Sequence, residues 1–270
     1  MTKRSVLLIY TGGTIGMVEN KSTGTLEPFD FNHLLNEVPE LQQFNLNIGT
    51  YQFNPPIDSS DMVTEHWVKM SRIINSNYQR YDGFVVLHGT DTMAYTASAL
   101  SFMLENLSKP VVLTGSQLPI GTLRTDGKEN LITAIEIAAD YKPDGTARVP
   151  EVCVFFDSQL MRGNRTTKIS AEYFQAFASN NYPTLAHANI HIRYATDHIL
   201  KASEKPLNVH LEMSRDVFIF SLFPGIQENM VRQLFNTPGL KGVVMRTFGS
   251  GNAPQKKWLM ECLKEAIDRG

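Results

Sequence analysis

The sequence has few cysteines, almost no excess of charge of either sign and no long apolar run. Its two cysteines, Cys153 and Cys262, lie far apart, which is neither a disulfide framework nor the spacing of a metal-binding pair. We expect both to be small core residues. Lysine and arginine total 25 and aspartate and glutamate total 27, so the net charge is −2. Binding to a phosphate backbone needs a basic excess, so nucleic acid is not an expected partner.

Membrane insertion and secretion also lack their usual signals. No stretch approaches the roughly 18 apolar residues of a transmembrane helix, and the apolar run that begins at Ser5 is too short for a signal peptide. The expected location is therefore the cytoplasm, with no membrane partner. Hydrophobic residues make up 42% of the chain, which is enough to build a substantial core and excludes general disorder.

Short apolar runs rich in β-branched residues alternate with segments of helical spacing. The runs at 6–9, 83–87, 111–113 and 152–156 are typical of buried parallel strands. Apolar residues between them recur at helical spacing, as at 93–104 and 131–139. This alternation predicts an α/β fold in which a mostly parallel sheet is flanked by helices.

The pattern loosens after about residue 183 and then resumes. We predict an N-terminal catalytic domain over 1–188, a linker over 189–214 and a smaller C-terminal α/β domain over 215–270. The last part has two apolar runs, each followed by a segment of helical spacing. Two parallel strands and two helices cannot cover both faces of a sheet, so this domain is predicted to be incomplete or completed by a partner.

A glycine-rich loop at 11–16 directly follows the first predicted strand. Thr11 stands where a dinucleotide fingerprint needs its first glycine, and a polar loop follows where that motif needs a helix, so we reject the nucleotide-binding interpretation. Paired glycines instead let the backbone approach a ligand closely and leave the hydroxyls of Thr11 and Thr14 at the strand end. Thr14 is a candidate nucleophile, and the alternative is that both hydroxyls only bond the backbone of the turn.

A second loop, His88-Gly89-Thr90-Asp91-Thr92, follows the next central strand and precedes a helix. Asp91 or Thr92 is an ordinary candidate for the helix cap. Thr90 and Asp91 also bring a hydroxyl and a carboxylate to the edge of the sheet where ligands bind, and that carboxylate suits a substrate ammonium. We expect His88 to be packed and hydrogen-bonded.

Further polar segments carry weaker signals. Hydroxyls in turns explain both the 58–61 segment and the 114–117 segment, and Lys168 on its own is an ordinary solvated cation. If Lys168 enters the cleft near Thr90 and Asp91, it helps to activate a hydroxyl. No HExxH motif is present, so metal binding has poor support in the sequence.

Taken together, the segments 11–16, 58–62, 88–93 and 162–168 resemble those of bacterial L-asparaginases of the cytoplasmic type I class, and the resemblance runs through nearly the whole chain. It implies that Thr14 attacks the side-chain amide of L-asparagine and that Thr90, Asp91 and Lys168 form a second catalytic cluster. It further implies homodimers or homotetramers and no cofactor. Substrate-binding residues are also implied, with Asp91 holding the α-amino group; the others are Ser59, Ser60, Gly89 and Ser116.

Two departures from that family are visible. Its members commonly carry a tyrosine in the loop after the first motif, whereas residues 17–50 here contain none, and Thr25 lies near the expected place. Family members also continue for several tens of residues beyond the position of Gly270. The resemblance therefore implies that this chain is a fragment or a short form whose second domain lacks its end.

Two other functions are compatible with the same motifs. The first is the amidase subunit of a transfer-RNA-dependent amidotransferase, which predicts an added RNA-interacting domain and a basic surface. The net charge of −2 and a first strand that begins at about Ser5 disfavour it. The second is a truncated amino-acid-binding protein, which predicts binding of asparagine or aspartate without turnover.

Overall fold

The computed structural model describes residues 3–19, 26–28 and 38–270. The chain forms two compact units, one over residues 1–211 and the other over residues 212–270. Within the described residues, no helix is both long enough and apolar enough to cross a membrane.

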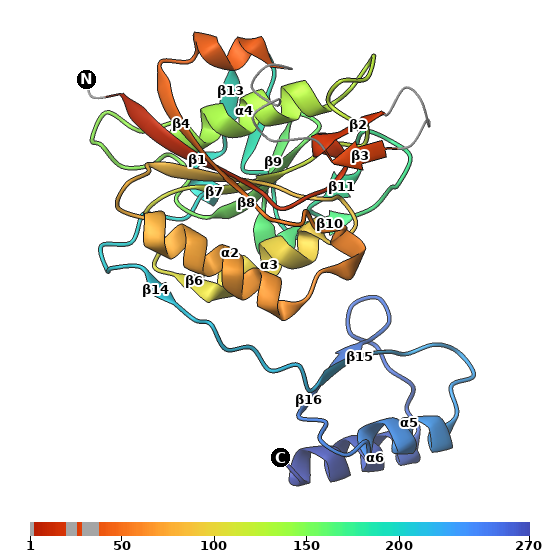
Figure 1. Ribbon diagram of the computed structural model, residues 1–270. Coiled ribbons are helices and arrows are strands. Elements are labelled where there is room, and N and C mark those ends of the chain that lie inside the picture. The colour runs from red at the N-terminus through yellow and green to blue at the C-terminus, as the bar shows by residue number, and fades with distance from the viewer. Residues whose placement is uncertain (1–2, 20–25, 29–37) are drawn as a thin grey trace. The chain divides into compact units, whose positions relative to one another are not determined.

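One eight-stranded sheet organises the larger unit (Figure 1). In spatial order its strands are β13 (Ile192–Tyr194), β12 (Ala186–Ala188), β9 (Gln159–Arg162), β8 (Val152–Phe156), β7 (Val111–Thr114), β5 (Gly83–Leu87), β1 (Arg4–Tyr10) and β4 (Leu46–Gln52). The five strands from β8 to β4 run parallel, and β9, β12 and β13 are antiparallel additions. The predicted α/β fold with a mostly parallel sheet is thereby confirmed.

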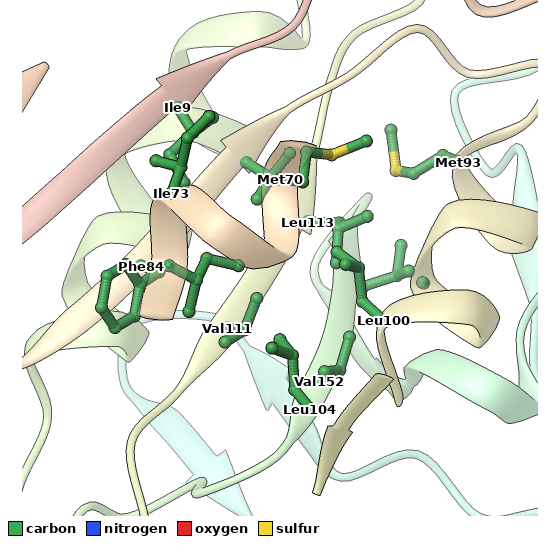
Figure 2. Packing of buried hydrophobic residues seen from close by; sticks show 14 of the residues in the cluster. Ile9, Met70, Ile73, Phe84, Met93, Leu100, Leu104, Val111, Leu113 and Val152 are labelled. Carbon is green, nitrogen blue, oxygen red and sulfur yellow. The ribbon is translucent and has the colours of Figure 1, made fainter. Parts of the chain in front are cut away.

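Helices cover both faces of this sheet. Side chains of successive strand residues point to opposite faces, so each central strand contributes to two separate cores. Helix α4 (Gly127–Ala139) packs on the face formed by Val6, Leu8 and Tyr10 of β1. Helices α2 (Thr64–Asn77) and α3 (Met93–Met103) pack on the face formed by Leu7 and Ile9 (Figure 1). Figure 2 shows the second core, where methionines and aliphatic side chains of the helices meet those of the strands.

The chain reverses its direction of travel across the sheet at β1. From β1 it moves to β4 on one side, and then it crosses through α2 to β5 on the other side. The carboxyl ends of β1 and β5 therefore flank a topological switch point, where doubly wound sheets bind their ligands. The glycine-rich loop at 11–16 and the loop at 88–92 start from these two strand ends.

Short pieces of regular structure complete the larger unit. The two-stranded pairs are β2 (Met17–Glu19) with β3 (Leu26–Pro28), β10 (Thr167–Lys168) with β11 (Phe177–Ala178), and β6 (Leu104–Glu105) with β14 (Asn208–Val209). The 3-10 turns are η1 (Thr14–Gly16), η2 (Pro39–Gln43), η3 (Ser59–Asp61), η4 (Gly163–Arg165) and η5 (Thr196–His198). Several of these pieces carry the polar segments that the sequence singles out.

The smaller unit pairs two parallel strands, β15 (Val217–Ser221) and β16 (Gly242–Arg246), with two helices, α5 (Glu228–Phe235) and α6 (Lys257–Asp268). Its core is an apolar cluster built around Phe220, Phe235 and Leu259. Cys262 belongs to this cluster as a free, buried thiol, and Cys153 is likewise free and buried in the larger unit. Both cysteines are therefore core residues, as expected.

The structure differs from the sequence prediction in the region of the proposed linker. Residues 192–194 form β13 at the edge of the large sheet, and residues 208–209 pair with β6. Most of the segment 189–214 is therefore part of the larger unit, and the division falls at residue 212. The predicted linker is too long, because short antiparallel edge strands have no continuous apolar run that would reveal them.

Helix α3 provides a matched test of core packing. Leu100 is fully buried in the core that α2 and α3 form with the sheet, whereas Phe102 on the same helix is 69% exposed. Leu100→Ala is expected to lower the free energy of unfolding by about 2–5 kcal/mol, because it leaves a cavity in the core. Phe102→Ala should change it by less than about 0.5 kcal/mol. Urea unfolding followed by circular dichroism checks this, and equal effects of the two variants would contradict the described packing.

Candidate active site

Three loops meet at the switch point, and Gly13 and Gly89 have no room for side chains of their own there. A Cβ atom added to Gly13 would lie 2.5 Å from the Cα of Gly89, and one added to Gly89 would lie 2.5 Å from Oγ of Ser59. Gly12 and Gly13 also have positive φ angles of 139° and 91°, which residues with side chains rarely adopt. The loops after β1 and β5 are thus in direct backbone contact, and the Ser59 side chain of η3 packs against Gly89.

The two threonines of the glycine-rich loop have different surroundings. Thr11 is buried, and its hydroxyl donates a hydrogen bond to the carbonyl of Leu87 at 2.9 Å, so it joins the ends of β1 and β5. Thr14 is half-buried in η1, and among the described residues its hydroxyl has no hydrogen-bond partner. The backbone-bonding alternative therefore fits Thr11, and the Thr14 hydroxyl is available to a ligand. Thr25 lies outside the described residues.

Lys168 joins the second cluster to the β5 loop. Its Nζ donates to Oγ1 of Thr90 at 2.8 Å and to Oδ1 of Asp91 at 2.7 Å. The side chain of Lys168 is 18% exposed, whereas that of Asp91 is 63% exposed. The lysine is thus largely enclosed while the carboxylate remains within reach of a ligand ammonium. The three residues of the predicted cluster lie together although 77 positions separate Asp91 from Lys168.

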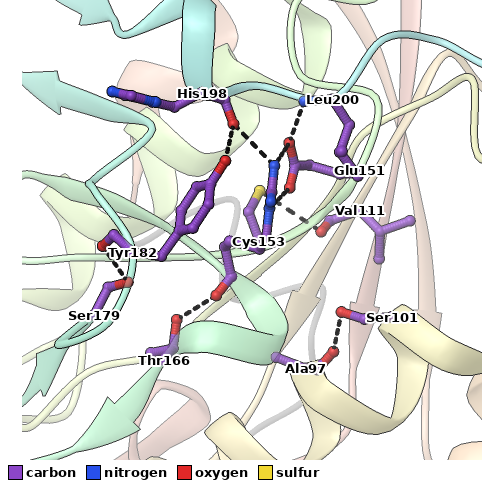
Figure 3. Close-up of polar contacts among 11 residues, drawn as sticks. Ala97, Ser101, Val111, Glu151, Cys153, Thr166, Ser179, Tyr182, His198 and Leu200 are labelled. Atoms are coloured by element: carbon purple, nitrogen blue, oxygen red, sulfur yellow. Dashed lines mark hydrogen bonds and ion pairs between the residues drawn. The ribbon is translucent and has the colours of Figure 1, made fainter.

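The segment that delivers Lys168 is held by polar contacts at its start. The guanidinium of Arg162 bonds the carboxylate of Glu151 at 2.7 Å and the carbonyl of His198 at 2.8 Å. Figure 3 shows Glu151 also accepting from the backbone of Leu200, and Thr166 donating to a backbone carbonyl, which is that of Arg162. The Glu151 side chain is 3% exposed, so this ion pair is buried. It fixes the strand end from which the chain runs to Lys168.

His88 supports the β5 loop from inside the protein. It is fully buried, and burial lowers the pKa of its imidazole to about 4. Its Nδ1 lies 2.7 Å from the carbonyl of Gly89, which only accepts, so Nδ1 carries the hydrogen. Nε2 therefore accepts from the hydroxyl of Thr96 at 2.8 Å, and that hydroxyl accepts from Trp67 Nε1 at 2.9 Å. His88 is packed and hydrogen-bonded, as expected.

The predicted substrate-binding serines lie in three different settings. Ser59 is 4% exposed and packs against Gly89, and its carbonyl accepts from the hydroxyl of Thr92 at 2.6 Å. Ser60 is exposed, and both its hydroxyl and its backbone N–H donate to Asp58. The backbone hydrogen bond and then the hydroxyl bond from Ser60 lower the pKa of Asp58. Ser116 is buried, and its hydroxyl donates to the carbonyl of Leu118 at 2.6 Å.

A further side chain, which the sequence identified only as part of the 114–117 segment, also contacts the cluster. Oε1 of Gln117 lies 3.4 Å from Oγ1 of Thr90. Glutamine in a loop carries no sequence signal of its own, and only the neighbouring ends of β5 and β7 bring it to Thr90. Within the described part of the chain, no three His, Cys, Asp or Glu side chains are grouped so that they could hold a metal ion.

This fold and site define a class, namely a doubly wound α/β protein with a hydroxyl-rich site at its switch point. Comparison with known proteins agrees with that class. The family model for the N-terminal domain of asparaginase matches residues 5–200, and the model for the glutaminase/asparaginase C-terminal domain matches residues 216–270. The chain therefore belongs to the asparaginase family, which is a family of amidohydrolases.

Individual relatives support the same membership. L-asparaginase 1 of Escherichia coli (strain K12) is 44% identical over 271 residues, which cover all of this chain and 78% of that protein. The 60 kDa lysophospholipase of Mus musculus is 44% identical over 99% of this chain and 50% of its own length. The crystal structure of L-asparaginase I from Vibrio cholerae superposes with a TM-score of 0.90 at 40% identity and covers all of this chain and 79% of its own.

The buried His88 predicts a pH dependence of stability. Its native pKa of about 4 lies below the ordinary value of 6.5, so between these pH values the unfolded chain binds a proton that the native protein does not. Stability therefore falls as the pH is lowered from 6.5 to 4, and His88 accounts for a share on the order of 3 kcal/mol. The stability advantage of the wild type over His88→Asn should shrink across this window in urea titrations. The exposed control, His191→Asn, should show no such trend.

Proposed function

We propose that this protein hydrolyses L-asparagine to L-aspartate and ammonia, with Thr14 as the nucleophile. The observation that carries the proposal is the contact of Lys168 with Thr90 and Asp91, which lie in the loop adjoining that of Thr14. The E. coli and Vibrio cholerae relatives are both named L-asparaginases. The match to the type I relative also favours the cytoplasmic location expected for that class.

The reaction proceeds in two displacements. In the first, Oγ1 of Thr14 forms a bond to the side-chain carbonyl carbon of asparagine, the C–N bond breaks, and the proton of the hydroxyl accompanies the nitrogen as ammonia leaves. In the second, a water oxygen bonds to the same carbon, the C–O bond to Thr14 breaks, and the hydroxyl regains a proton. An amide is a poor electrophile, so positioned proton transfer and donors aimed at the developing oxyanion are both required.

The substrate is oriented by its two α-charges. The exposed carboxylate of Asp91 binds the α-ammonium, and Ser59 with its neighbour Ser60 binds the α-carboxylate. The backbone of Gly89 and the Ser116 segment complete the wall of the site. Fixing both charges sets the distance to Thr14, so a side chain of one length places its amide at the nucleophile.

Assembly and cofactors follow from the same proposal. The reaction is hydrolytic and is driven by side chains and water, so it uses no organic cofactor and no metal. The subunits assemble as homodimers or homotetramers, and the second domain takes part in that assembly.

Replacement of Thr14 tests the proposed nucleophile. Thr14→Ala is expected to lower ammonia release from L-asparagine by at least about 10³-fold, because the acyl-enzyme cannot form. Thr50→Ala, which alters an exposed threonine on β4, is the matched control and should retain full activity. Ammonia release is measured with a coupled assay on the purified chain. If asparagine binds to the wild type without any release above the variant's background, the chain is a binding protein and the proposed activity is wrong.

Substrate length tests the proposed orientation. L-glutamine carries one more methylene, so with both α-charges fixed its amide is displaced from Thr14. The value of kcat/KM for glutamine should be at least about tenfold lower than that for asparagine. Parallel ammonia-release assays on the two amino acids give this ratio, and equal values would show that the α-charges do not set the position of the amide.

A further inference from the structure

Gln117 occupies a position between the two halves of the catalytic cluster. It follows β7, and its side chain lies between the loop after β5 and the loop after β10. Oε1 lies 3.4 Å from Oγ1 of Thr90, and Nε2 lies 3.0 Å from the carbonyl oxygen of Tyr173. Tyr173 is five residues beyond Lys168. The amide of Gln117 therefore contacts both the hydroxyl and the segment that carries the lysine.

The chemistry of the partners fixes the direction of each hydrogen bond in the series that runs from Lys168 through Thr90 and Gln117 to Tyr173. A backbone carbonyl only accepts, so the NH₂ group of Gln117 must face Tyr173 and its oxygen must face Thr90. The ammonium of Lys168 only donates, so Oγ1 of Thr90 accepts from it. The hydroxyl hydrogen of Thr90 is left to be donated to Gln117 Oε1.

The backbone of Gln117 is held independently of its side chain. Its N–H donates to both carboxylate oxygens of Asp126, at 3.1 Å and 3.0 Å, and the N–H of Leu118 donates to the same carboxylate at 3.2 Å. Asp126 immediately precedes helix α4, which packs on the large sheet. Asp126 also accepts from the buried side chain of Asn130 at 3.2 Å. Gln117 is thus placed by the rigid core of the unit and not by the ligand.

The loop that supplies the Tyr173 carbonyl is also ordered by its own contacts. Ser170 Oγ accepts from the backbone N–H groups of Glu172 and Tyr173, at 3.1 Å and 3.0 Å. The N–H of Ile169 donates to the carbonyl of Ala176 at 2.8 Å, which closes the loop. The carbonyl of Tyr173 therefore has a defined position from which it can orient the amide of Gln117.

We propose that Gln117 is a positioning residue that fixes the hydroxyl hydrogen of Thr90, so that this hydroxyl presents a lone pair to the ligand site. A hydroxyl has one hydrogen and two lone pairs. Gln117 takes the hydrogen and Lys168 takes one lone pair, which leaves the second lone pair for an incoming molecule. Given the asparaginase activity, on which this inference rests, Thr90 accepts a hydrogen bond from the attacking water or from the substrate nitrogen.

Two substitutions separate this role from a packing role. Gln117→Met keeps the length of the side chain but removes the acceptor, which frees the Thr90 hydroxyl to rotate. We expect kcat for asparagine to fall about tenfold while KM stays within about twofold. Gln117→Glu keeps the acceptor for Thr90 but loses the donor to the Tyr173 carbonyl, so its kcat should lie between those of Gln117→Met and the wild type. Both variants should keep the wild-type thermal midpoint.

A failure of this inference can be distinguished from a failure of the proposed function. Absence of ammonia release by the wild-type chain contradicts the asparaginase activity. A wild-type kcat in Gln117→Met would contradict the role of Gln117. A fall in kcat that accompanies a lower thermal midpoint in both variants would contradict it as well. A double variant with Thr90→Val adds a further check, because Gln117→Met should then change the residual activity no further.

The hydrogen-bond order is also testable on the wild-type protein without turnover. Hydrogen exchange of the Gln117 side-chain amide, followed by nitrogen-15 NMR, should be slower than that of Gln255, whose side chain is exposed. The bond to the Tyr173 carbonyl protects one of the two amide hydrogens. Equal exchange rates for the two glutamines would overturn the inference even if the Gln117→Met variant failed to fold.

Discussion

The site depends on the close backbone approach between the loops that follow β1 and β5. A Cβ atom on Gly12 would lie 2.0 Å from the carbonyl oxygen of Ile57, and one on Gly13 would meet Gly89. Only glycine allows these loops to touch while the chain takes positive φ angles. Thr14 directly follows Gly13, and Thr90 directly follows Gly89. The contact between the two glycines therefore brings the segments of Thr14 and Thr90 together, although the two threonines are 76 positions apart in sequence.

Two ion pairs in the larger unit differ in burial and in consequence. Arg162 and Glu151 are largely buried and share their remaining hydrogen-bonding capacity with backbone groups, so they fix a strand end. Lys168 and Asp91 lie at the ligand edge, where the carboxylate is mostly exposed. A pair whose carboxylate is mostly exposed adds little stability, so its geometry matters chiefly for what it can bind. The first pair positions the chain that presents the second.

Buried polar groups of fixed direction support the site from below. His88 is neutral and can carry only one hydrogen, so its bonds to Gly89 and Thr96 fix its tautomer. Asp126 does the same for the β7 loop by accepting from Gln117 and Leu118. The candidate catalytic side chains thus project from loops whose backbones are held by the core. Preorganisation of this kind limits the reorganisation that a reacting site must undergo.

The sequence by itself determined the central strands, the helices α3 to α6 and the motifs at the strand ends, because continuous apolar runs and helical spacing are local signals. It missed helix α2. It also missed the edge strand β4 and assigned β13 to a linker, since edge strands are short or half-exposed and lack continuous apolar runs. Local patterns could name Thr90 and Lys168 as candidates, but their 2.8 Å contact depends on the crossing of chain segments 78 positions apart. Gln117 became part of the site only in the tertiary structure, because the pairing of β5 with β7 decides which loop residues meet.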